Sequence, residues 1–299
     1  MRSPWPDPRR LAAALLALVM TVSALVPERT RAQERELSPQ EERWRDADLG
    51  DDLYFAASNA VVSGVAAAVI AAFRDHVSVR EAFLGGAAGG LAVFLAKRVA
   101  AERFTGAGLL ARQIGSVGAS VGRNAAAGRM PFERIVLSAG LARIYWDRAS
   151  GEVQVKPDLN AIGWTVRAAF EPRAEFDWSR SLSAGAPVFL TRDATFENGA
   201  AGRALGNVIV ADPAARIPLD DIMAHERVHV VQLDQHFILW GEVFEGWAAG
   251  LLGDRSSGIV GHVDLVLPTI LTGLGVGALW PGPWVRNPLE TEAYFMQMR

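Results

Sequence analysis

The sequence contains no cysteine in its 299 residues. Disulfide bonds are therefore excluded, and so is a lipoprotein, because no cysteine can receive a lipid behind an export signal. The fold must be held together by packing and by any metal that the chain binds.

Basic residues are not in excess, since 30 Lys and Arg stand against 33 Asp and Glu, for a formal net charge of -3. No basic stripe or aromatic-basic motif indicates a nucleic-acid partner. A phosphate-binding GxxxxGK[ST] loop is also missing from the sequence. We therefore expect no nucleic acid and no nucleotide cofactor.

The N-terminal region has the features of an export signal. Arg9 and Arg10 precede the apolar run 11–26, which is short for a stable transmembrane helix, and small residues suited to cleavage follow at 30–32. We predict a signal peptide at residues 1–32, with an uncleaved anchor as the alternative. The protein would be exported across the inner membrane and be periplasmic, envelope-associated or secreted. Removing five basic and two acidic residues with this segment leaves 25 against 31, a net charge of -6.

Two of the five histidines lie four residues apart, in His225-Glu226-Arg227-Val228-His229. On a helix, residues four apart share a face, so His225 and His229 can bind one metal ion. Glu226 can reach a water molecule on that ion and polarise it as general base. Such a pattern arises by chance in roughly one chain in two hundred of this composition, so it predicts a zinc site.

The segment Ile222–Trp240 lacks Gly and Pro, and its apolar residues recur with helical spacing, which predicts a helix. His236 lies on the same stripe as the two ligands, but two turns too far along to share their metal. The metzincin pattern does not fit, because Gln232 and Gln235 occupy the positions of its Gly and third His. We therefore expect the third ligand to come from a second helix.

A C-terminal helix is predicted from Asn287, a favoured N-cap, and Pro288. The stretches 225–232 and 290–294 resemble the HExxH and ExxA[D] motifs of gluzincin-type zinc peptidases, which include membrane peptidases. A similar pairing, HExxHVVQ with a later NPxExEA, occurs in uncharacterised bacterial peptidase-like families. The resemblance covers about the last third of the chain and implies Glu290 as third ligand and Glu226 as base.

Two features leave the ligand set open. Tyr294 stands where many gluzincins have an Asp that hydrogen-bonds a ligand His, and Glu292 is an alternative to Glu290. His262 and Asp264 could also complete an aspzincin-like site, although structural roles are favoured because the rest of that signature is missing. His76 is predicted to lie in a surface loop.

Residues 53–130 are rich in Ala and Gly and contain no Pro, which predicts helices with breaks near 74–80 and 105–106. A charged arm, residues 33–52, precedes them. Small residues recur four apart at two places, which lets helix backbones approach closely: Gly86–Gly90 and Gly118–Gly122.

Two uncharged runs, residues 53–73 and 265–280, raise the question of membrane contact. The first is long enough to span a bilayer but weakly hydrophobic, and the second is short and contains Pro268. We favour a soluble or peripheral helix layer for the first run, with a membrane-associated hairpin as the alternative. The second run is expected to be a buried crossing or an interfacial segment.

Residues 131–212 alternate short apolar segments with turn residues, which predicts an antiparallel, meander-like sheet. The expected strands lie at 134–147, 152–156, 163–170, 175–178, 187–191 and 207–211, with a hairpin turn at 148–151. By resemblance to zincins, Asn207–Ala211 would be an edge strand that pairs with an extended substrate; an interior strand is equally compatible.

The sequence thus predicts an α+β fold, with an Ala/Gly-rich helical region at 53–130 followed by an antiparallel sheet and zincin-like helices at 131–299. The expected function is that of an exported zinc metallopeptidase acting on a peptide or protein. One alternative is an envelope- or membrane-associated helical protein whose metal site is structural or degenerate. Another is a zinc hydrolase of a non-peptide substrate such as a cell-wall amide.

Overall fold

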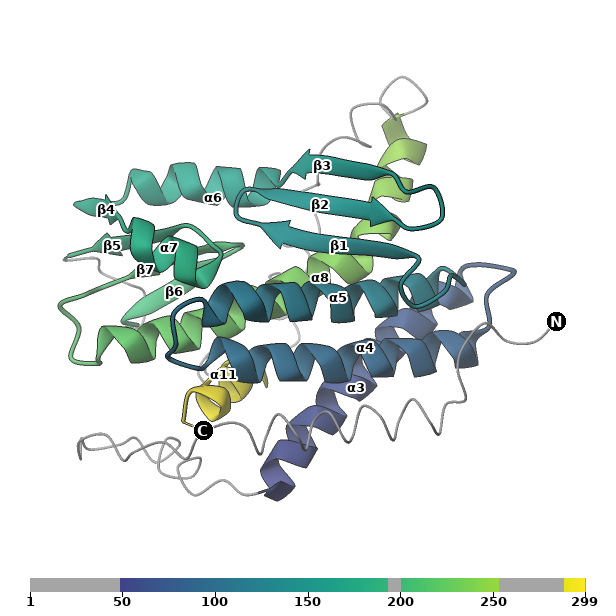
Figure 1. Cartoon of the computed structure of the whole chain (residues 1–299), viewed down its shortest axis with the longest axis horizontal. Coiled ribbons are helices and arrows are strands. Elements are labelled where there is room, and N and C mark those ends of the chain that lie inside the picture. The colour runs from purple at the N-terminus through teal and green to yellow at the C-terminus, as the bar shows by residue number, and fades with distance from the viewer. Residues whose placement is uncertain (1–48, 193–199, 253–287, 299) are drawn as a thin grey trace.

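The computed structural model describes residues 49–192, 200–252 and 288–298 (Figure 1). The described chain has the α+β fold that the sequence predicts. Several predictions lie outside the described residues: the signal peptide, most of the charged arm, the run 265–280, and residues His262, Asp264 and Asn287.

The Ala/Gly-rich region forms three helices, α3 (Leu49–Ala72), α4 (Val79–Ala100) and α5 (Ala107–Ala126). The predicted breaks between them are confirmed. Ser78 caps α4 by accepting a hydrogen bond from the Glu81 backbone N–H at 3.3 Å. The charged arm was predicted to extend to residue 52, but α3 already begins at Leu49 because Asp51 and Asp52 suit a first helical turn.

Glycines on α4 allow the three helices to pack backbone against backbone. A Cβ atom at Gly90 would lie 2.2 Å from the Asn59 carbonyl oxygen of α3, and one at Gly89 would lie 2.4 Å from the Gly118 carbonyl oxygen of α5. No side chain fits at such distances, so the small-residue spacing in the sequence is explained by helix approach.

A first sheet is an antiparallel meander of β1 (Arg134–Ala139), β2 (Ala142–Asp147) and β3 (Val153–Pro157), and β1 packs against α5 (Figure 1). The predicted turn at 148–151 is confirmed, with Gly151 in the left-handed region at φ 73°. One hydroxyl joins the two layers, since Ser120 of α5 accepts a hydrogen bond from the Val136 backbone N–H at 2.9 Å.

The predicted strand at 163–170 is wrong, because these residues belong to helix α6 (Leu159–Ala169). Asp158 caps this helix by accepting a hydrogen bond from the Ala161 backbone N–H at 3.0 Å. The cap and the helical spacing of buried Ala161 and Ala168 outweigh the strand propensity of the Trp, Thr and Val residues between them.

A second sheet has the order β4-β5-β7-β6, made by β4 (Ala174–Phe176), β5 (Val188–Thr191), β7 (Val208–Ala211) and β6 (Gly202–Leu205). The predicted strand at 175–178 ends early, because Asp177 caps helix α7 (Trp178–Ala184). The prediction of an antiparallel sheet fails for one pair, since β5 and β7 run parallel.

Of the two alternatives for Asn207–Ala211, the interior strand is confirmed and the edge strand is wrong. β7 lies between β5 and β6, and all four of its residues are buried. A strand covered on both faces carries apolar residues without alternation, as in Val-Ile-Val-Ala here. Among the described strands of this sheet, β6 is the one that flanks β7 at the edge near the HExxH helix.

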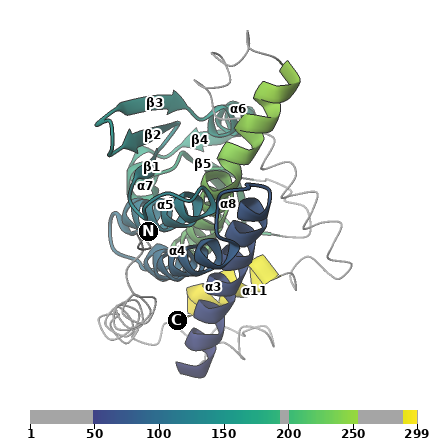
Figure 2. The ribbon, with the colours of Figure 1, turned by 90° about the vertical axis from the view of Figure 1, so that its right-hand side faces the viewer.

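The HExxH helix is α8 (Leu219–Leu252), which is longer than predicted because Gly241 does not end it. A helical Gly costs about 1 kcal/mol, too little to terminate a well-packed helix. α8 packs against α5 and α4 on one side and against β6 and β7 of the second sheet, and the short α11 (Pro288–Met298) packs against it (Figures 1 and 2). Phe55 of α3 stacks on Phe295 of α11 with ring centroids 4.3 Å apart.

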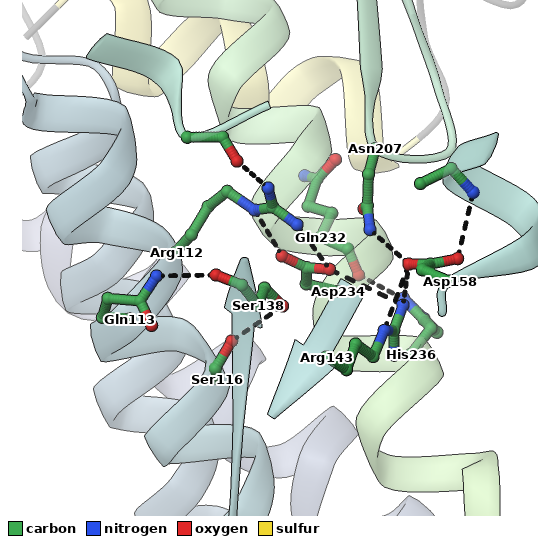
Figure 3. A network of polar contacts seen from close by, with 12 residues as sticks. Arg112, Gln113, Ser116, Ser138, Arg143, Asp158, Asn207, Gln232, Asp234 and His236 are labelled. Atoms are coloured by element: carbon green, nitrogen blue, oxygen red, sulfur yellow. Dashed lines mark hydrogen bonds and ion pairs between the residues drawn. The ribbon is translucent and has the colours of Figure 1, made fainter. Parts of the chain in front are cut away.

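A buried polar network fixes α8 against its neighbours (Figure 3). Arg112 of α5 pairs with Asp234 of α8 at 2.8 Å, and Arg143 of β2 pairs with Asp158 at 3.0 Å. Asn207 donates a further hydrogen bond to Asp158 at 2.8 Å. Removing one partner of such a buried pair typically costs about 3–5 kcal/mol, so the Arg112–Asp234 pair holds α8 against α5, and Asp158 joins the two sheets.

Candidate metal centre

The HExxH segment lies in the first turns of α8, beside β6. His225 and His229 point to the same side of the helix, as their spacing predicts, with 3.1 Å between their Nε2 atoms. Their rings meet edge to face, with centroids 4.8 Å apart.

Glu290, in the first turn of α11, completes the cluster from a segment 61 positions beyond His229 in the sequence. One of its carboxylate oxygens lies 3.2 Å from His225 Nε2, and the other lies 3.3 Å from His229 Nε2. Three potential ligand atoms therefore converge, one from each residue, within 4.8 Å of one another.

These separations suit a tetrahedral metal ion. Bonds of about 2.0–2.1 Å in tetrahedral geometry place neighbouring ligand atoms about 3.3 Å apart. The two Nε2 atoms lie 3.1 Å apart, and each lies 3.2–3.3 Å from a different oxygen of Glu290, so these pairwise distances are close to that spacing. His225, His229 and Glu290 could therefore hold a metal ion without a large rearrangement.

The charges of the cluster are strongly coupled. Burial alone would lower the pKa of His229, but hydrogen bonding to Glu290 and the negative charges of Glu290 and Glu226 raise this pKa to about 9. Burial would raise the pKa of Glu290, but hydrogen bonds from both histidines keep it well below the usual range. Without a metal, a proton on His229 thus takes the place of a cation.

Glu226 lies beside the cluster with its carboxylate buried. Burial raises its pKa, an effect that the two histidines and a hydrogen bond from the backbone of Ala204 in β6 partly offset. Among the described residues, none hydrogen-bonds its Oε2 atom. A buried carboxylate oxygen without a partner is costly, so this atom is suited to a ligand or a water molecule.

Glu292, the alternative third ligand, is not in the cluster. Its carboxylate accepts hydrogen bonds from Lys97 Nζ at 2.6 Å, from Gln232 Nε2 at 2.9 Å and from Asn59 Nδ2. Residues two apart on a helix lie about 200° apart around its axis, so Glu290 and Glu292 face different neighbours.

The other candidate residues lie elsewhere. His236 is half-buried, its Nδ1 donates to the Gln232 carbonyl oxygen at 2.7 Å, and desolvation lowers its pKa. His76 is exposed in the turn between α3 and α4, as predicted. Tyr294 packs its ring on His225, with centroids 4.5 Å apart, where a gluzincin Asp would be expected.

The chain also contains a Gly-x-Ser-x-Gly pattern at residues 118–122, which is typical of serine hydrolases. It lies within α5 rather than at a turn from strand to helix. Ser120 is buried, and its hydroxyl donates to the Ser116 carbonyl oxygen at 2.7 Å. The pattern is therefore structural.

Sequence reasoning missed the residues around the cluster. The sequence gives Gln232 as the last residue of the HExxHVVQ stretch and as a mismatch to the metzincin pattern, but assigns it no role, whereas its Oε1 atom lies 2.8 Å from His229 Nδ1. Lys97, Asn59 and Ala204 come from elements whose proximity to the site no local pattern reveals. The charge of Lys97 in an Ala/Gly-rich helix was the one available signal, because a buried Lys needs a partner.

No model of a known protein family matches the chain, and no match was found among curated proteins or solved structures.

Proposed function

We propose that this protein is a zinc-dependent hydrolase that cleaves peptide bonds. One observation carries the proposal: His225, His229 and Glu290 bring three ligand atoms to one point, and Glu226 lies beside them with a buried oxygen that meets no partner in the described chain. Metal ligands alone would serve a structural site, whereas the adjacent carboxylate adds a group able to move protons.

The donor set favours zinc. Two imidazoles and a carboxylate, without a thiolate, are the ligands of many catalytic zinc sites, which leave one position open. A bound Zn²⁺ acts as a Lewis acid and lowers the pKa of water. The chain's own contribution is to hold the three ligands at tetrahedral spacing and to exclude most bulk water, since all three side chains are largely buried.

Glu226 is proposed as the general base and acid. It would accept a proton from the attacking water and deliver it to the leaving amine. The backbone of Ala204 orients its carboxylate, and β6 lies alongside. An extended peptide added to β6 would run past Glu226, so β6 replaces β7 as the proposed substrate-binding strand.

The proposed place of action is outside the inner membrane. The N-terminal features of an export signal support it, and the substrate would then be an envelope or secreted peptide or protein.

Metal analysis of the purified protein tests the proposal. The wild type is expected to hold one zinc ion per chain, and Glu290→Ala to lose it. Glu292→Ala is expected to bind zinc at saturating concentration, because its carboxylate does not reach the cluster. A wild type that binds no divalent metal would overturn the proposal.

A second candidate function is membrane association. It is favoured by the way polar and apolar side chains are distributed between the buried and exposed faces of α3. Three of its nine buried residues are polar: Asp52, Asn59 and Ser63. Its exposed face is apolar and includes Tyr54, Val61, Val62, Val65 and Val69. A helix surrounded by water normally shows the reverse arrangement.

By length and composition, α3 and α4 could both cross a membrane. The 21 uncharged residues 53–73 would extend about 31 Å as a helix, close to the thickness of the hydrocarbon layer of about 30 Å. The proposal predicts carbonate-resistant retention in membranes that is lost when Val62 and Val65 are both replaced by Lys. Wild-type protein that carbonate releases completely would count against it.

A further inference from the structure

A chain of hydrogen bonds leads outward from the metal cluster through a single ligand. His229 Nδ1 lies 2.8 Å from Gln232 Oε1 on the next turn of α8. Gln232 Nε2 donates to Glu292 at 2.9 Å and to the Leu289 carbonyl oxygen at 3.2 Å, both on α11. One amide side chain thus connects a ligand to the helix that supplies the third ligand.

The chain continues into the N-terminal helices. Glu292 pairs with Lys97 of α4 at 2.6 Å and accepts a hydrogen bond from Asn59 of α3. Lys97 Nζ also donates to Asn59 Oδ1 at 2.7 Å. Lys97 and Glu292 are 3% and 6% exposed, so water screens this ion pair very little.

The chemistry of these groups fixes the direction of each hydrogen bond. A carbonyl oxygen and an ionised carboxylate can only accept, so the NH₂ group of Gln232 must face Leu289 and Glu292. Its Oε1 atom then faces His229 and can only accept as well. The proton of the neutral imidazole therefore lies on Nδ1, which leaves the Nε2 lone pair directed at Glu290 and His225, where a metal would bind.

We propose that Gln232 and Glu292 are positioning residues that select the metal-binding tautomer of His229, and that Lys97 and Asn59 make helices α3 and α4 part of the metal centre. This inference rests on the proposed metal site. It assigns Glu292 a role different from that of a ligand, and it gives a reason for burying a lysine within an Ala/Gly-rich helix.

The hydrogen bonds of Gln232 and Glu292 select the tautomer of His229 only. Within the described residues, His225 Nδ1 is buried and has no hydrogen-bond partner, and its ring is held by packing against Tyr294. The tautomer of His225 is therefore not selected in the same way. The effect of the positioning residues should appear at His229 and not at His225.

The negative charge of Glu292 contributes to this selection. In Glu292→Gln the new amide can donate as well as accept, so only the longer hydrogen bond to the Leu289 carbonyl oxygen, at 3.2 Å, still opposes a turned-over Gln232 that presents its NH₂ group to His229. The imidazole would then accept at Nδ1 and carry its proton on Nε2, which competes with the metal. Gln232→Met removes the amide group that bonds His229, Leu289 and Glu292, while it keeps a side chain of similar length.

Zinc affinity of the full chain, measured by competition with a chelator, tests the proposal. Glu292→Gln and Gln232→Met are expected to bind zinc roughly 10–100-fold more weakly than the wild type, the usual effect of removing a group that orients a ligand. Asp158→Asn is the matched control: its buried carboxylate pairs with Arg143 outside the chain of bonds. It should lower the melting temperature and leave zinc affinity unchanged.

Nuclear magnetic resonance of the histidine ring nitrogens gives a readout that general destabilisation would not move. In the zinc-loaded wild type, a slowly exchanging proton is expected on His229 Nδ1, and Gln232→Met should lose its protection from exchange. Zinc affinity unchanged in both variants would overturn the inference. If Glu292→Gln does not fold, Gln232→Met decides, because it removes no charge. A wild type that binds no zinc would instead overturn the metal site itself.

Discussion

At the scale of single residues, a metal ion bound by the His225–His229–Glu290 cluster would compete with a proton for His229. Its pKa of about 9 in the folded chain exceeds the unfolded value of about 6.5, because Glu290 and Glu226 favour the charged ring. A raised pKa means that the folded state binds the proton more tightly than the unfolded state. The resulting stability is fully present below pH 6.5 and is lost as the pH rises through 9.

We therefore predict opposite pH dependences for the two forms of the protein. The melting temperature of the metal-free protein should fall between pH 6.5 and pH 9. Zinc affinity should rise over the same range, by up to about tenfold per pH unit, since each zinc ion displaces the His229 proton. Calorimetry and chelator competition across this range check both trends. Zinc affinity independent of pH would contradict the proton assigned to His229.

Glu226→Gln tests the assigned chemistry separately from metal binding. The amide keeps the size of the side chain but cannot accept the proton, so peptide hydrolysis should fall by about 10²-fold or more. Zinc content should stay at the wild-type level, because Glu226 is not among the three clustered ligands. Hydrolysis is measured on a peptide library, with zinc quantified in the same samples. Full activity in this variant would exclude Glu226 as the base.

The sequence could not decide whether Glu290 or Glu292 is the third ligand. Both carboxylates lie in the first turns of α11, and both faces of that helix are covered by protein. Which one meets the histidines depends on the rotation of α11, which is set by the burial of Phe295 and Met296 against α3, α4 and α8. That rotation is a property of tertiary packing and has no local signature.

At the scale of elements, the helices of the Ala/Gly-rich region pack so closely that glycine is required where their backbones meet. Gly89→Ala should destabilise the fold by about 1–3 kcal/mol, because a Cβ there would lie 2.4 Å from the Gly118 backbone. Gly163→Ala on α6 is the matched control. Its Cβ would meet open space, and the better helix propensity should stabilise by roughly 0.5–1 kcal/mol. Urea unfolding measures the free energy of unfolding of both variants. Equal changes in the two variants would exclude a steric clash between α4 and α5 as the cause.

The long helices were predictable for a physical reason, whereas the short helices α6 and α7 were not. Small-residue spacing and uninterrupted helical periodicity identify α3, α4, α5 and α8 along the sequence. The segment after Asp158 has the composition of a strand, and its cap decides the outcome. The order of strands in the second sheet depends on the parallel pairing of β5 and β7, whose paired residues lie 21 positions apart in sequence.

At the scale of the whole molecule, the cluster joins the start of α8 to the C-terminal helix α11. The same helix is tied to α3 and α4 by the Lys97–Glu292 ion pair and by the stacking of Phe55 on Phe295. A metal ion would thus bind to groups that the folded chain alone brings together, so metal binding and folding are thermodynamically linked.

Zinc should accordingly stabilise the whole chain. At a free zinc concentration 100 times the Kd, the linkage amounts to about 2.7 kcal/mol, which corresponds to a rise in Tm of roughly 5–10 °C for a chain of this size. Differential scanning calorimetry with zinc and with a chelator measures the shift. Glu290→Ala should lose the shift because the cluster then has two ligands, whereas Asp158→Asn should keep it from a lower starting Tm. A shift of equal size in Glu290→Ala would mean that zinc stabilises the protein from another site.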